Sequence, residues 1–181
     1  MGLLGAPTEF RYQGVAKSVE VARDMVPGTP RIGLLMREDD PRNEPRWEFA
    51  QEAAALLGVE ALLVTFRSAA DFDAAFADLA RERVGVVVVP NDNIVYANGP
   101  AIIAAAEAVR MPTLYSNRGS LEDGLANYSR NYIGNMRIAA GYVARILEVA
   151  NPAEMAIELI QVEMRINLNA AARIGFTFPA S

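Results

Sequence analysis

Polar side chains suited to binding a small molecule occur in short groups, and each group directly follows an apolar run. The most apolar run, residues 84–89, holds five valines and one glycine. Pro90 ends it, because proline cannot donate a hydrogen bond to a neighbouring strand. The candidate binding residues after the successive apolar runs are Arg37 and Asp39; Asn91, Asp92 and Asn93; Ser116, Asn117 and Arg118; and Tyr128.

These residue types together suit a zwitterionic organic ligand. The carboxylate of Asp92 can accept from an ammonium group, and the guanidinium of Arg118 or Arg130 can bind a carboxylate. The ring of Tyr128 can stack on an aromatic ligand. Two other interpretations remain open: a simple polar turn followed by a helix cap at residues 91–93, and a rim of solvated surface charges.

The composition argues against most enzyme chemistry. The chain of 181 residues has no histidine and no cysteine, so the usual general base, the thiolate nucleophile and the commonest metal ligands are missing. Lys17 is the one lysine, and it lies in a predicted helix. We therefore expect no catalysis, no metal and no cofactor.

The charge and the known phosphate motifs also narrow the function. A net charge of -5 without a basic stripe gives no reason to expect nucleic-acid binding. No apolar run is long enough to insert into a membrane, and neither glycine-rich nucleotide-binding motif is present. Asp39, Asp40, Asp92 and Ser116 fit the layout of a phosphoacceptor pocket, but Arg130 stands where that pocket needs a lysine.

Alternating apolar runs and helical patterns predict the elements that position these residues. The pattern is typical of a three-layer, doubly wound parallel sheet with strand order 2-1-3-4-5. Its polar groups would meet at the edge formed by the carboxyl ends of the strands. The predicted strands are residues 31–36, 59–66, 84–89, 112–116 and 125–128, and the predicted helices are 11–26, 43–58 (capped by Asn43), 70–82 and 101–109.

The last third of the chain has a different pattern. Residues 131–149 form the longest amphipathic helix, and its apolar positions are Ile133, Met136, Ala140, Val143, Ile146 and Leu147. An extended stretch at 157–166 precedes a short helix that begins after Asn167 and ends at Gly175. We divide the chain into a lead-in and first helix (1–30), a Rossmann-like ligand-binding lobe (31–130) and a long helix with a C-terminal arm (131–181).

Five stretches, in this order and spacing, resemble a known family. They are residues 22–35 (ARDMVPGTPRIGLL), 88–93 (VVPNDN), 111–115 with 123–128, 139–147 (AAGYVARIL) and 166–179 (INLNAAARIGFTFP). They are similar to the C-terminal half of substrate-binding proteins of ABC transporters, of the type I periplasmic class and its tryptophan/tyrosine-type branch. The resemblance covers nearly the whole chain and implies solute binding without catalysis.

The resemblance also implies partners and a location. Family members are longer, with an export signal and a first lobe, and they work with an ABC permease in the periplasm. Residues 1–7 do not form a signal peptide as they stand, so the cytoplasm is expected if this is the full product. By resemblance the long helix would pack on the first lobe, and without that lobe we expect a homodimer through residues 131–166.

Two departures from the family pattern bear on the ligand. The chain has Glu148 where the family has glycine, and the loop at residues 37–45 is more charged than usual.

The alternative functions are a dimeric sensor that no longer serves transport and, less favoured, a doubly wound enzyme acting on carbonyl substrates.

Overall fold

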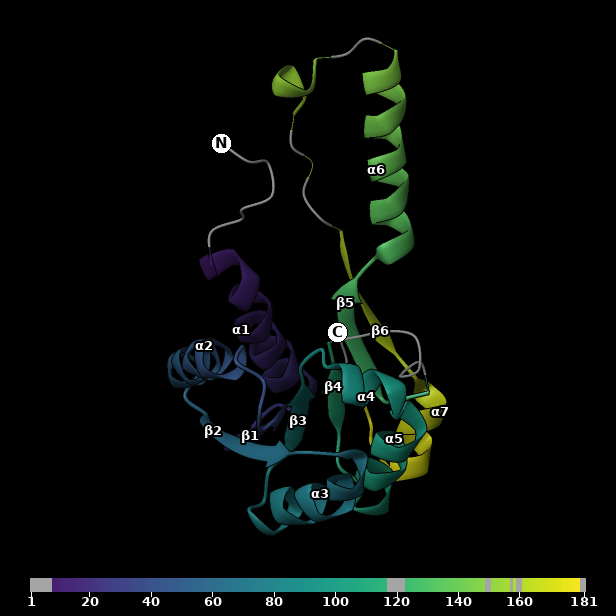
Figure 1. Ribbon diagram of the computed structural model, residues 1–181. Coiled ribbons are helices and arrows are strands. Elements are labelled where there is room, and N and C mark those ends of the chain that lie inside the picture. Colours follow the sequence, from purple (N-terminus) through teal and green to yellow (C-terminus); the bar gives the residue numbers. More distant parts are fainter. Residues whose placement is uncertain (1–7, 117–122, 149–150, 157, 159–160, 180–181) are drawn as a thin grey trace.

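A six-stranded sheet forms the centre of the protein (Figure 1). The computed structural model describes residues 8–116, 123–148, 151–156, 158 and 161–179. The strand order is β2-β1-β3-β4-β5-β6; the first five strands are parallel, and β6 is antiparallel to β5. The doubly wound fold and the order 2-1-3-4-5 are confirmed, whereas the sixth strand was predicted only as an extended stretch. The strands are β1 (Arg31–Arg37), β2 (Glu60–Phe66), β3 (Val86–Val89), β4 (Thr113–Tyr115), β5 (Ala126–Arg130) and β6 (Val162–Ile166).

Helices cover both faces of the sheet. One apolar cluster joins α1, α2 and α7 to one face, and a second joins α3 and α5 to the other. None of the helices among the described residues is both long and apolar enough to cross a membrane. The helices are α1 (Thr8–Met25), α2 (Asn43–Leu56), α3 (Phe72–Arg81), α4 (Asn93–Ala97), α5 (Gly99–Ala108), α6 (Tyr132–Leu147) and α7 (Leu168–Ile174), with short 3-10 turns η1 (Ala69–Asp71) and η2 (Pro152–Glu154).

The valine run behaves as its pattern predicts. All four residues of β3 are buried, because helices cover the sheet on both sides and side chains alternate between the faces. Val86 and Val88 pack in the cluster with α1 and α2, while Val87 and Val89 pack with α3 and α5. This central strand therefore holds the two halves of the core together.

The first helix contributes a stripe to the core. Val15, Val19, Ala22 and Met25 recur at helical spacing, and all four are buried against the sheet and α2. At the other end of the chain, α7 also packs on the sheet, since Ala170 is buried in the same cluster.

The division of the chain into three parts at residues 30 and 130 stays a prediction.

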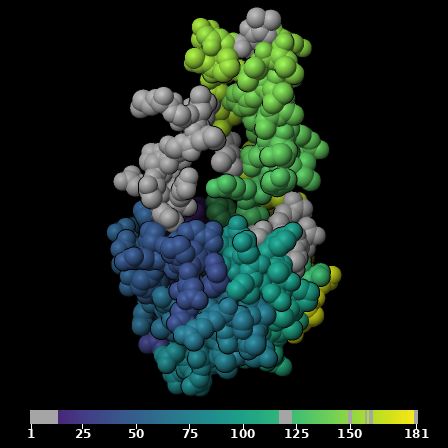
Figure 2. Space-filling model, viewed as in Figure 1, coloured from purple at the N-terminus to yellow at the C-terminus, as the bar shows by residue number. Residues whose placement is uncertain are grey.

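The long helix α6 projects away from the sheet (Figures 1 and 2). None of its side chains is buried against another described part of the protein. Asn131 caps its first turn by accepting from the backbone N–H of Gly134 at 2.8 Å. A returning segment stays beside α6 because Asn135 exchanges two hydrogen bonds with the backbone of Gln161, at 3.1 and 2.9 Å.

Candidate functional site

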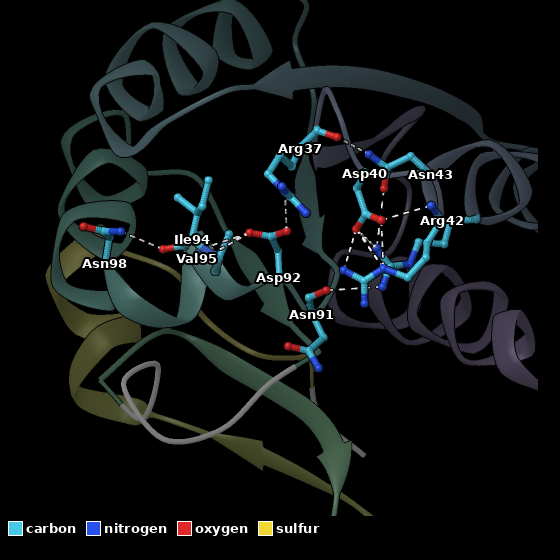
Figure 3. A network of polar contacts seen from close by, with 10 residues as sticks. Arg37, Asp40, Arg42, Asn43, Asn91, Asp92, Ile94, Val95 and Asn98 are labelled. Carbon is cyan, nitrogen blue, oxygen red and sulfur yellow. Dashed lines mark hydrogen bonds and ion pairs between the residues drawn. The ribbon is translucent and has the colours of Figure 1, made fainter.

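The carboxyl ends of β1, β3 and β4 meet at one edge of the sheet. Arg37 ends β1, Asp92 follows β3, and Ser116 follows β4, in neighbouring parallel strands. Figure 3 shows Arg37 reaching across to Asp92, with Asn91 beside them. The expected convergence of these three loops is therefore present.

Asp92 is buried and already bonded through both carboxylate oxygens. One oxygen accepts from the backbone N–H of Ile94 at 2.7 Å and from that of Val95 at 3.4 Å, and so caps α4. The other oxygen accepts from Arg37 Nε at 2.9 Å. The helix cap that the sequence left open is thus what Asp92 forms, and its binding of a ligand ammonium stays a prediction.

Arg37 is held in place from two directions. Its backbone carbonyl accepts a hydrogen bond from the side-chain amide of Asn43, and its Nε is bonded to Asp92. Asn43 itself was predicted to cap α2, but this is wrong: Arg42 holds the cap position, and the Asn43 amide bonds the end of β1 instead. The Arg37 side chain keeps 30% of its surface exposed.

A second carboxylate, Asp40, anchors the loop after β1. Its side chain is only 2% exposed and accepts from Arg42 Nη2 at 2.6 Å and from Arg46 Nη1 at 3.1 Å. The hydrogen bonds from Arg42 lower the pKa of Asp40 from 3.8 to about 2, against burial, which raises it. Arg46 also donates to the backbone carbonyl of Asn91 at 3.2 Å, so it ties α2 to the loop after β3.

The sequence offered Asp40 only as part of a phosphoacceptor layout, and its pairing with Arg42 and Arg46 was not predicted. Aspartate and arginine in a polar loop are usually solvated, and a rim of solvated charges was one of the interpretations left open. The available signal was the spacing: Arg42 lies two residues after Asp40, at the cap of α2, and Arg46 lies four residues after Arg42, inside that helix.

The remaining predicted residues are less closely joined. Asn91, Asn93 and Asp39 are exposed. The hydroxyl of Ser116 lies 3.4 Å from that of Ser18 in α1, a helix that sequence reasoning did not place at the site. The half-buried Tyr128 packs against the core cluster of α1 and α2, and Asn117 and Arg118 lie outside the described residues.

A separate polar hollow lies at the opposite edge of the sheet, where β5 begins and β6 ends. It has a volume of about 300 Å³, and its polar lining comes from Asn127, Arg165, Asn167 and Asn169. None of the predicted site residues that the structure describes lines it. Across the described ranges, no cluster of three or more acidic side chains is arranged to hold a metal ion.

Three solved structures are similar to this chain. A conserved domain protein from Vibrio cholerae has 25% identity and a TM-score of 0.71, over 91% of this chain and 56% of that one. A Streptococcus pneumoniae ABC domain in complex with L-Trp has 19% identity and a TM-score of 0.69, over 92% and 57%. A ligand-free, open substrate binding protein with adhesive properties from Clostridium difficile has 18% identity and a TM-score of 0.76, over 91% and 56%.

The chain thus spans little more than half the length of these structures, and the two likenesses below 25% identity show the fold alone. No curated protein matches the sequence. A family model described as ABC transporter substrate binding protein matches residues 12–181, which is nearly the whole chain. Proteins of that family bind solutes, are generally non-catalytic and usually work outside the cytoplasm. The chain belongs to the ABC transporter substrate-binding protein family.

Proposed function

We propose that this chain is a ligand-binding lobe of an ABC importer and binds a small amino-acid-like or other organic solute without catalysis. The observation that carries the proposal is the Arg37–Asp92 pair, fixed by a buried helix cap at the strand edge where such folds bind ligands. Arg37, Asn91, Asn93 and Ser116 supply guanidinium, amide and hydroxyl groups there. Further predicted ligand residues are Asp39, Asp92, Asn117, Arg118 and Tyr128.

The mechanism is binding followed by enclosure. A ligand site usually buries most of a small molecule's surface, and one open sheet edge covers only part of it. Since the similar structures are longer than this chain, we expect a second lobe or subunit to complete the enclosure. Outside the cytoplasm, the ligand-bound protein would then deliver its solute to an ABC permease.

We also propose that this chain forms a homodimer through residues 131–166. Ile133, Met136, Ala140, Val143 and Leu147 follow one another at alternating spacings of three and four, which is the seam of a helix pair. Ile133 is 55% exposed, Val143 56% and Leu147 80%. An apolar stripe of this kind usually marks a contact surface, and a second copy offers the same stripe.

The test is a binding screen on the purified full chain. Thermal shift and heteronuclear NMR with amino acids, including L-tryptophan, and other small organic solutes should identify a ligand, and mass spectrometry should recover that ligand unchanged. Conversion of the ligand would contradict the non-catalytic role. A screen in which no solute shifts any resonance would overturn solute binding.

Native mass spectrometry of the same sample tests the dimer. A mass of two chains is expected, and a monomer at every concentration would refute the proposal. The alternative function, a dimeric sensor without transport, would be favoured if the ligand-bound dimer failed to stimulate any permease encoded with it.

A further inference from the structure

We propose that the solute is a carboxylate and that the two Nη groups of Arg37 bind it, with Asp92 as the positioning residue. This inference rests on the proposed function, because it assigns a ligand class to the same strand edge. It differs from the sequence-based expectation, in which Arg118 or Arg130 bound the carboxylate and Asp92 bound an ammonium.

The free donors of Arg37 carry the argument. A guanidinium has five N–H donors, and Asp92 uses only the one on Nε. Within the part of the chain that the structure describes, no acceptor bonds Nη1 or Nη2 of Arg37. The side chain is 30% exposed, so these four donors remain for a ligand.

Asp92 fixes the direction in which those donors point. Its side chain is 6% exposed, and its other oxygen is held by the first turn of α4. The guanidinium is therefore oriented from the protein side by its bond to Asp92 (Figure 3). Two parallel N–H groups match the two oxygens of a carboxylate, a fit that lysine cannot provide.

A cationic ligand fits the geometry less well. To reach Asp92, an ammonium would have to approach a residue that, backbone included, is only 5% exposed. It would also have to compete with Arg37 and two backbone N–H groups. Ligand recognition through Arg37 needs no such rearrangement.

The experiment compares acids with their amides. L-tryptophan, L-tyrosine and L-leucine, each beside its α-carboxamide, are titrated into the full chain and followed by NMR at millimolar concentration. We expect at least one acid to bind about tenfold or more tightly than its amide, since a charged hydrogen-bonding pair is lost in the amide. The Arg37→Gln substitution should weaken binding of the acid by a similar factor and change the affinity for the amide by no more than about twofold.

Three further variants separate binding from folding. Arg31→Gln is the matched control, because Arg31 begins the same strand, pairs with Glu60 at 2.7 Å and lies at the opposite edge; its acid preference should be unchanged. Arg37→Lys keeps the charge but should recover only part of the preference. Asp92→Asn preserves a good helix cap and should reduce the preference by misorienting Arg37.

The outcomes distinguish the two proposals. If an amide or an amine binds as well as its acid, or if Arg37→Gln keeps the acid preference, the carboxylate assignment is wrong while solute binding stands. If no acid, amide or other solute in the screen binds, the proposed function fails, and this inference fails with it.

Discussion

Replacing Asp40 by asparagine should destabilise the protein and remove part of its sensitivity to acid. Asp40 is the most buried charged group at the strand edge, and it joins Arg42 and Arg46 to one carboxylate. Asparagine has nearly the same shape and still accepts the backbone N–H of Arg42, which lies 3.0 Å from Oδ1. The substitution therefore removes the charge with little change in packing.

The lowered pKa sets the magnitude. A fall in the pKa from 3.8 to about 2 on folding corresponds to about 2 kcal/mol of stability near neutral pH. Because the folded state holds the proton less tightly than the unfolded state, this stability is present above the ordinary pKa and is lost as the pH falls. About half of it should be gone near pH 3.

Urea unfolding of both proteins, followed by circular dichroism, measures this effect. The free energy of unfolding should differ by about 2 kcal/mol near pH 6 and by about 1 kcal/mol near pH 3. Asp78→Asn is the control, because its pair with Arg81 is exposed, and it should cost less than about 0.5 kcal/mol. The role given to the Asp40 network would be refuted if Asp40→Asn changed the free energy of unfolding by less than about 0.5 kcal/mol, or by an amount that stays constant with pH.

Three other substitutions test the core, a helix cap and the exposed helix. Gly33→Ala should cost about 1–3 kcal/mol in urea unfolding, because the new Cβ would lie 2.6 Å from Leu79 Cδ2; an unchanged midpoint would contradict this close packing. Asn167→Ala should cost about 1 kcal/mol by removing the cap of α7, whereas Asn167→Asp should be nearly neutral in the same assay. Val143→Glu should abolish the dimer in native mass spectrometry while changing monomer stability by less than about 0.5 kcal/mol, and a dimer that persists would place the interface elsewhere.

Much of the fold follows from local pattern. Residues 86–89 are a strand buried on both faces because four consecutive valines fit only there. Phe72, Ala75, Phe76 and Leu79 of α3 recur at the spacing of one helix face, and all four are buried. Asn167 and Gly175 bound α7 as predicted, the glycine with a φ of 70°.

The parts that sequence reasoning missed depend on contacts distant in the chain. The stretch at 162–166 becomes a strand because it pairs with β5 in antiparallel register, and Ile166 meets Ala126 forty residues away. Its alternating polar and apolar residues do not specify that partner. The helix α4 has only five residues, too few to produce a periodic signal.

The site was predictable in position but not in its pairings. Strand order placed the loops after β1, β3 and β4 together, and residue types named Arg37 and Asp92 as candidates. No local pattern shows that these two side chains bond each other across 55 positions. The Asp40 network was missed for the opposite reason, since its residues are close in sequence but their burial depends on how α2 packs.

Asp92 shows why the structural and functional interpretations of a motif need not compete. A helix cap uses one carboxylate oxygen, and the second oxygen remains available to a neighbouring strand end. In this protein that second oxygen holds Arg37. Capping keeps the carboxylate in a fixed place, and a fixed carboxylate is what an arginine needs if its free donors are to recognise a ligand's geometry rather than only its charge. The same bonds that complete α4 thus also preorganise the proposed site, and Asp92→Asn should separate the two roles because it preserves the cap and removes the charge.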